Sequence, residues 1–571
     1  MSGERRQFRA LMRLFAYRFF DTDIVSVRGD LSALLAQFAA LLAALSFVLL
    51  LAVTPKYAGL YQHLTAAQLG VAAWGDQEFL ISTTMAIVGV FTLLLWDALF
   101  PDRRDCLILG VMPVHARTIF RAKLAALGSA LGLAIVAANC FTGVVCPFLI
   151  VRHPAGVAGI LRGFAAYWLV ILLASLFVFL VLIGLQGAAL HLLPHGRFLR
   201  WSSFLQMGAF FAILALYFLT PPLAGRQEPV SPGNRIWYEL VPSYWFFGLF
   251  QSMTGAAETA QVLLAKRAIA GTIAAGLTAT IFYVLAYRRQ MRRTAEQAGI
   301  VPSGRPLALV RAAGRIVSRQ ASERAILDFI RRTLARSRQH RLLLAIYTGM
   351  GLAYVFSQVA YVLYHFRADG FGAVEGREQT MLGIPLILLF FLVIGLRVSF
   401  SIPMELPANW LFRLAGPFGG RAYLAASRKT LLWFALAPVV VLSAGIYPLV
   451  WPWPKAACHV AFLTVFGLLI IELALTGFDK IPFTCSYLPG KANLKIMFGV
   501  YWGLLIIVSE VVTAIEIDAL RHGFGRLMAV TLAAWLAAAG RARRVRSRVS
   551  SLRFEEQPEP AVAGLGLAGP L

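Results

Sequence analysis

Acidic residues and cysteines are scarce in this chain. Of 571 residues only 27 are Asp or Glu, against 53 Lys or Arg, and charged residues make up 14% of the total. The five cysteines are Cys106, Cys140, Cys146, Cys458 and Cys485, and they form neither a CxxC pair nor a His–Cys ligand spacing. This pattern argues against a disulfide framework and against a metal site. The scattered acidic residues also give no catalytic cluster, so we expect no catalytic residues and no cofactor.

A nucleotide-binding motif is missing as well. The string closest to GxxxxGK[ST] is CSYLPGK, from Cys485 to Lys491, which lacks the first Gly and the trailing Ser or Thr. We interpret Gly490 and Lys491 as a turn whose lysine reaches toward the membrane surface. A cleavable signal peptide is not recognisable either, because the first apolar run starts near Leu31, behind an arginine-rich segment.

Long apolar runs dominate what is present. The chain is 59% hydrophobic, with a mean hydropathy of +0.72, which excludes a soluble protein of this length and predicts a polytopic membrane protein. The net charge of +26 could indicate a nucleic-acid partner. The basic residues cluster at the ends of the apolar runs instead, so no nucleic acid is expected.

The fold class predicted from these runs is all-α, with about twelve transmembrane helices in two parallel six-helix repeats. The predicted spans are 31–53, 79–100, 122–151, 164–193, 201–223, 262–287, 342–365, 381–403, 430–451, 456–477, 496–516 and 526–539. They give an N-terminal cytoplasmic segment (1–30), a first bundle (31–290), a basic linker (291–341), a second bundle (342–540) and a basic, then disordered tail (541–571).

The distribution of positive charge predicts the orientation. Lys and Arg are concentrated at the loops and span ends that this count places in the cytoplasm. We therefore expect a multi-pass protein of the cytoplasmic (inner) membrane with both termini in the cytoplasm.

Two basic amphipathic helices are predicted, one before each bundle. In the first helix, residues 5–20, the apolar residues lie on one face and the arginines on another. In the second helix, within the linker, apolar residues spaced four apart lie on one face. The apolar residues are Phe8, Leu11, Met12, Phe15 and Phe19, then Ile326, Ile330 and Leu334; the arginines of the first helix are Arg6, Arg9 and Arg13. We predict that such helices lie at the bilayer surface against anionic headgroups; the alternative is a helix packed on the protein.

The loop after the second span of each half has the same layout. The first is LILGVMPVHARTIFRAK, ending at Lys123, and the second is LFRLAGPFGGRAYLAASRK, from Leu411 to Lys429. Each has an apolar run, a proline, a polar turn, a short apolar pair and a basic residue before the next span. This pattern indicates a duplicated unit.

With these features, the chain resembles the membrane domain of type-2 ABC exporter permeases. That family has a surface helix before its first span, a coupling helix between spans 2 and 3, and a partly re-entrant segment before its last span, matched here by 242–253. The last external loop of the second half, 518–524, is too short for a re-entrant segment. The first coupling loop corresponds to Asp102, Arg103, Arg104, Asp105, Leu107, Leu109, Pro113 and Arg117, with Ile119 and Lys123 following, and the second to Glu405, Asn409, Trp410, Arg413 and Arg421.

The resemblance implies a fused permease subunit that moves a substrate across the membrane. It also implies a separate ATP-binding cassette ATPase, in two copies, whose closure is transmitted through the two coupling loops. The chain itself is then not an enzyme.

Arg397, Glu472 and Glu510 are ionisable residues inside predicted spans, and at the centre of a span a charge costs about 2.5–3.5 kcal/mol on insertion scales. Arg397 and Glu472 lie at matching depths, so they either form a pair or reach the surface separately. Glu510 lies deeper; it either binds a cation or proton or bonds to a neighbouring helix.

Three other readings stay open. The string DRRD after the second span resembles the corresponding loop of major-facilitator carriers, which would make the chain an ion-driven secondary transporter. An integral-membrane transferase and a membrane scaffold are the other two alternatives.

Overall fold

The computed structural model describes 2–20, 31–63, 73–96, 99, 112, 114–150, 156–224, 235–255, 258–294, 320–369, 378–404, 420–476, 478, 481–484, 504–505 and 507–548. All regular structure in these segments is helical, as the all-α prediction requires. The chain forms two compact units, Met1–Val301 and Pro302–Leu571.

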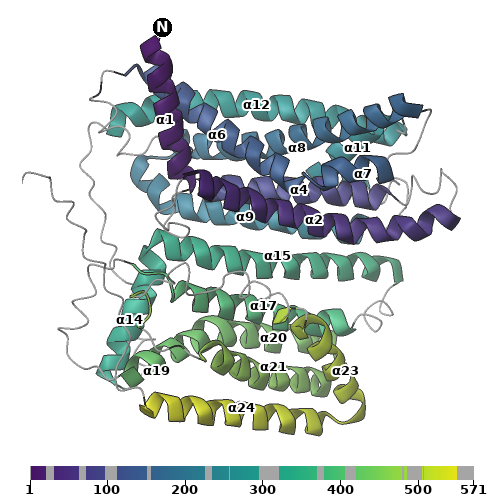
Figure 1. Ribbon diagram of the computed structural model, residues 1–571. Coiled ribbons are helices and arrows are strands. Elements are labelled where there is room, and N and C mark those ends of the chain that lie inside the picture. The colour runs from purple at the N-terminus through teal and green to yellow at the C-terminus, as the bar shows by residue number, and fades with distance from the viewer. Residues whose placement is uncertain are drawn as a thin grey trace, which may run out of the picture. The chain divides into compact units, whose positions relative to one another are not determined.

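The first unit is a bundle of long helices with one helix across its end. Helix α1 runs across the direction of α2, α8 and α12, as Figure 1 shows. Helix α8 packs against α11 and α12, and α4 packs between α8 and α9. The helices are α1 (Ser2–Phe20), α2 (Leu31–His63), α4 (Trp74–Leu94), α6 (Ala116–Ala138), α7 (Thr142–Ile150), α8 (Gly156–Leu192), α9 (His195–Ala224), α10 (Arg235–Leu240), α11 (Pro242–Thr254) and α12 (Thr259–Thr294).

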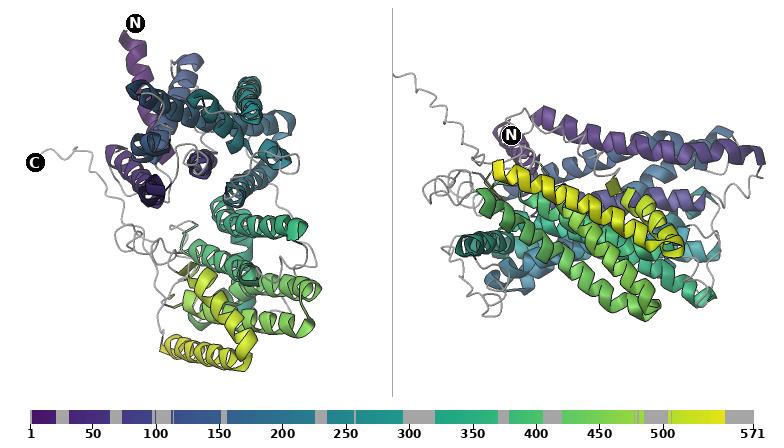
Figure 2. Two further views of the ribbon diagram at one scale, coloured as in Figure 1. Left: turned by 90° about the vertical axis from the view of Figure 1, so that its right-hand side faces the viewer. Right: turned by 90° about the horizontal axis from the view of Figure 1, so that it is seen from below.

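The second unit also begins with a transverse helix. Helix α14 lies across α15 in Figure 1, and α24 runs beside α21, as its yellow ribbon does in the right panel of Figure 2. The elements are α14 (Ala321–Arg336), α15 (Arg338–Asp369), α17 (Glu378–Ser399), α19 (Gly420–Leu431), η2 (Leu432–Leu436), α20 (Ala437–Val450), α21 (Trp453–Ala474), η3 (Ile507–Val512), α23 (Thr513–His522) and α24 (Phe524–Arg548). The core of the unit is formed mainly by α14, α17, α19 and α21.

Ten helices in the described part of the chain are long and apolar enough to cross a membrane. Six belong to the first unit and four to the second, and they coincide with the first ten predicted spans. The described parts of the last two predicted spans are η3 with α23, and α24. In α24 the apolar stretch between Arg526 and Arg541 is shorter than the about 20 residues of a typical span.

The third predicted span, 122–151, is not one continuous helix. It breaks at Asn139–Phe141 into α6 and α7. The break is stabilised by Ser46 of α2, whose Oγ accepts the backbone N–H groups of Phe141 and Thr142 at 3.1 and 3.2 Å. Because side-chain acceptors satisfy amides that a continuous helix would pair internally, the helix can end and restart inside the bundle.

Both predicted amphipathic helices pack on the protein. Leu11 and Phe15 of α1 are 8% and 1% exposed and face α6, while Arg6, Arg9 and Arg13 stay exposed. In α14 the predicted face of Ile326, Ile330 and Leu334 is buried in the core of the second unit. The apolar faces of both helices are therefore buried against the protein, as in the second alternative. The arginines of α1 named above remain exposed.

Candidate functional site

Most of the first predicted coupling loop lies outside the described residues: Asp102, Arg103, Arg104, Asp105, Leu107, Leu109 and Pro113. Its last predicted residue, Arg117, is exposed on the first turn of α6. Ile119 and Lys123, which follow, are 6% and 4% exposed. The Lys123 ammonium lies 5.5 Å from the centre of the Phe15 ring, so α6 is held to the transverse helix α1 by a cation–π contact.

The chain that enters this loop is tied to three other helices. The last carbonyl groups of a helix have no hydrogen-bond donor within the helix. At the end of α4 and just beyond it, side chains of other helices supply the donors. Gln206 of α9 donates to the Leu93 carbonyl and Gln186 of α8 to the Trp96 carbonyl, both at 2.7 Å. Tyr283 of α12 donates to the Leu99 carbonyl at 3.0 Å. These three hydrogen bonds join the end of α4 and the chain after it to α8, α9 and α12.

The second predicted coupling loop is described only at its borders. Glu405, Asn409, Trp410 and Arg413 lie outside the described residues, and Arg421 is in the first turn of α19, with its side chain not described. The chain entering the loop is fixed by Phe483, whose N–H donates to the Phe400 carbonyl at 3.0 Å and whose carbonyl accepts from Met404. His340 of α15 adds a hydrogen bond from Nε2 to the Ile402 carbonyl at 2.9 Å.

The helix that leaves the second loop contacts the transverse helix of its own unit. Lys429 of α19 forms a salt bridge with Glu323 of α14. The preceding residue, Arg428, forms a salt bridge with Glu472 of α21. Lys429 thus contacts the transverse helix of its unit, as Lys123 contacts α1.

The three predicted intramembrane charges have partners that the sequence does not reveal. Glu472 is 3% exposed and pairs with Arg428. Arg397 donates from Nε to the carbonyl of Ala474 at 2.9 Å, two residues beyond Glu472, and stacks on the Phe478 ring at 4.6 Å. The structure therefore brings Arg397 and Glu472 to the same end of the second unit.

Glu510 does not lie in the core of the described part of the second unit. It sits in the π-helical turn η3 with its side chain exposed. Gln379 of α17 donates to its carboxylate at 3.2 Å. This contact joins η3 to α17, as expected of a carboxylate that bonds to a neighbouring helix.

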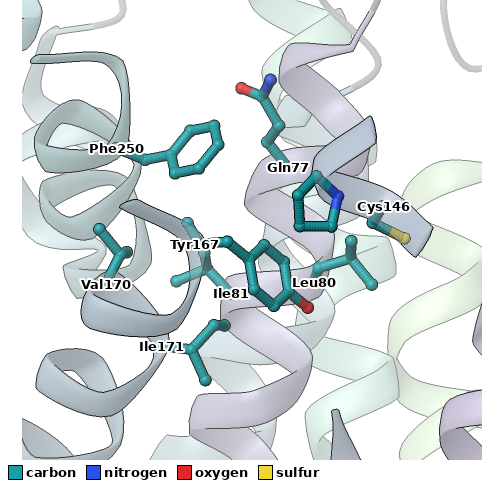
Figure 3. A pocket seen from close by; sticks show the side chains of 9 residues that line it. Gln77, Leu80, Ile81, Cys146, Tyr167, Val170, Ile171 and Phe250 are labelled. Carbon is teal, nitrogen blue, oxygen red and sulfur yellow. The ribbon is translucent and has the colours of Figure 1, made fainter. Parts of the chain in front are cut away.

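A pocket in the first unit was not predicted from the sequence. Figure 3 shows it between α4, α7, α8 and α11, with the Tyr167 ring at its centre and Gln77 at its edge. Its free volume is about 10 Å³, which is room for about one water molecule. Its lining is mostly apolar: Leu80, Ile81, Pro147, Val170, Ile171 and Phe250, with Gln77, Cys146 and Tyr167.

Polar residues surround this pocket on two sides. Tyr167 and Thr84 both donate to the Asn139 side-chain oxygen, at 3.0 and 3.1 Å. On α11, Ser243 donates at 2.6 Å to Glu78 of α4, which is 1% exposed. The second carboxyl oxygen of Glu78 has no hydrogen-bond partner among the described residues. In the sequence, the only sign that Glu78 is buried is its position directly before an apolar run.

The hydroxyl of Tyr244, next to Ser243 on α11, is also buried without a hydrogen-bond partner in the described part of the chain. Burial raises the pKa of Tyr244 above its usual range, and the nearby Glu78 raises it further. The residues around this pocket can therefore donate and accept hydrogen bonds. Comparison with protein family models, with characterised proteins and with solved structures gives no match for this chain.

Proposed function

We propose that this protein is the membrane-spanning permease subunit of an ABC-type exporter, driven by separate ATP-binding cassette subunits. One observation carries the proposal. In both units, a transverse amphipathic helix is held to the helix that follows a predicted coupling loop through a lysine of that helix: Lys123 on Phe15 and Lys429 with Glu323. A coupling element needs such a rigid support, because a loop that could move alone would transmit no force.

The same observation supports two repeats of six spans each. Each lysine ends the loop pattern of its half, and the order of transverse helix, two spans, loop and third span recurs. Ten of the twelve spans in this proposal coincide with long apolar helices. The two repeats then provide one coupling loop for each of two ATPase copies.

The proposed mechanism is mechanical. Nucleotide binding closes the ATPase pair, and the coupling loops move with it. In the first unit the movement passes to α8, α9 and α12 through the side chains of Gln186, Gln206 and Tyr283. The bundles rock and expose a central path alternately to the two sides of the membrane.

In this proposal both transverse helices lie on the cytoplasmic side of the inner membrane. The exposed Arg6, Arg9 and Arg13 of α1 then face anionic lipid headgroups. Their attraction to lipid would keep the support of the first loop at a constant height relative to the bilayer.

The test is affinity purification of the tagged chain from its native membrane, with mass spectrometry of the proteins recovered with it. We expect an ATP-binding cassette subunit with the wild-type chain and its loss with the variant R103E/R104E/L107A. A matched control, R541E/R543E, changes two exposed arginines of α24 and should leave recovery unchanged. If no ATPase is recovered while other membrane complexes stay intact, the proposal is wrong.

An ion-driven secondary transporter is the second candidate. It is favoured by the buried carboxyl of Glu78, which has an unpartnered oxygen in the described part of the first unit. Transport that persists without nucleotide and stops when the proton gradient is collapsed would support this candidate over the first.

A further inference from the structure

A histidine and a glutamate form an enclosed pair in the second unit. Nδ1 of His459, on α21, lies 2.7 Å from Oε1 of Glu516, on α23, and both side chains are 0% exposed. In the part of the chain that the structure describes, His459 Nε2 and Glu516 Oε2 are buried without a hydrogen-bond partner. The pair therefore consists of two ionisable groups whose single polar contact is with each other.

The surroundings of the pair are aromatic and apolar. The Tyr447 and Trp451 rings lie 4.7 and 6.2 Å from the His459 ring, centre to centre. The Tyr447 hydroxyl does not face the pair, because it donates to the Met381 carbonyl. These rings offer neither a counter-charge nor a further hydrogen bond.

Such surroundings favour the state of the pair with no net charge. A histidine and a glutamate share one titratable proton in that state, placed between Nδ1 and Oε1. Removing it leaves a buried carboxylate, and adding a second leaves a buried imidazolium; both are costly without a partner. The geometry therefore points to a site that holds one proton as long as the pair stays enclosed.

We propose that His459 and Glu516 form a binding site for a single proton, and that the bound proton holds α23 against α21. When α23 separates from α21, water reaches Glu516, the carboxylate becomes stable and the proton is released. This inference does not depend on the proposed exporter function.

A route for proton exchange lies next to the pair. Lys455, one helical turn before His459, pairs with Glu378 of α17, and Arg521 of α23 approaches the same carboxylate at 3.5 Å. Because Arg521 is 64% exposed, water reaches this cluster about 6–8 Å along each helix from the buried pair. The other titratable groups on α21, on α23 and on the elements packed against them are Tyr447, Cys458, Glu472, Glu510, Asp518 and His522, with Arg397 of α17, Arg421, Tyr423, Arg428 and Lys429 of α19, and Arg526, Arg541, Arg543, Arg544, Arg546 and Arg548 of α24.

The test is equilibrium unfolding of the purified full chain in detergent as a function of pH. A histidine in an unfolded chain loses its proton around pH 6.5. Above that pH the folded pair holds one proton more than the unfolded chain, so stability must fall as pH rises. We expect the unfolding equilibrium constant of the wild type to rise about tenfold per pH unit between about pH 6.5 and about pH 8.5.

The variant E516Q keeps the shape of the side chain but cannot hold the proton, so its unfolding equilibrium constant should rise less steeply than that of the wild type, by about tenfold per pH unit. Its matched control is D518N, which alters an exposed histidine–carboxylate pair on the same helix, 73% and 75% exposed, and should retain the wild-type profile. If E516Q does not fold, H459L/E516L replaces both groups by apolar ones and should show the same reduced slope. A profile of E516Q or of the double variant that follows the wild type would overturn the proposal.

Discussion

Arg428 and Glu472 show how one residue can decide the stability of the second unit. Glu472 has a side chain 2% exposed, whereas that of Arg428 is 29% exposed. If the arginine is removed, less of the desolvation free energy of the buried Glu472 carboxylate is offset by an opposite charge. If both charges are removed, this destabilisation disappears.

We expect R428M to lower the free energy of unfolding by about 1–3 kcal/mol, less than a fully buried pair loses because the arginine is partly hydrated. The double variant R428M/E472Q should recover most of this loss in denaturant unfolding of the purified protein. In the exposed pair of Arg332 with Asp328, R332M should cost less than about 0.5 kcal/mol. A double variant as unstable as R428M would show that the charge on Glu472 is not the cause.

The partners of these ionisable residues could not be predicted from the sequence. The sequence predicts similar depths for Arg397 and Glu472, and the structure brings Arg397 to the carbonyl of Ala474, two residues beyond Glu472. Arg428 was placed in a loop, so its contact with Glu472 could not be foreseen. The helix α19 in fact begins at Gly420 and carries Arg428 into the bundle.

At the scale of elements, α11 and α12 pack closely at a glycine. A Cβ added at Gly248 of α11 would lie 2.6 Å from the Gln261 carbonyl oxygen and 2.7 Å from Leu264 Cβ. Neither can move without moving α12, so glycine is required for the two helices to approach this closely. This packing also holds Ser243 of α11 beside Glu78.

The substitution G248V should separate α11 from α12 and lower the free energy of unfolding by about 2–4 kcal/mol. Thermal unfolding of the detergent-solubilised protein measures this. At Gly132 of α6 no atom lies within 4 Å of an added Cβ, so G132A should be neutral or slightly stabilising. Equal melting temperatures for G248V and the wild type would contradict the close packing.

The elements themselves could largely be predicted, because apolar runs of membrane length leave few alternatives. The amphipathic faces of α1 and α14 were also predicted correctly. What a hydropathy pattern cannot contain is a break stabilised from another helix. The turn at Asn139 depends on Ser46, almost a hundred residues earlier, and the pocket beside it follows from that turn.

At the scale of the whole molecule, two connected questions are the orientation and the number of spans. The distribution of positive charge predicts that α1 and α14 are cytoplasmic. The prediction can be tested by introducing single cysteines into a variant without native cysteines and labelling them with a membrane-impermeant thiol reagent. Arg13 and Arg332 are exposed on these helices, and Glu258 and His522 are exposed at ends predicted to be outside. In intact cells we expect E258C and H522C to be labelled, and R13C and R332C only after permeabilisation.

The position of His522 also decides the span count. Six predicted spans separate it from Glu258, and an even number returns the chain to the same side. If 496–516 does not cross the membrane, five spans separate the two residues and H522C is protected while E258C is labelled. The described part of that segment, η3 with α23, is not among the ten long apolar helices, so this single residue tests the weakest step of the twelve-span prediction. Labelling of R13C in intact cells would instead invert the orientation, and the coupling loops would then face away from any cytoplasmic ATPase.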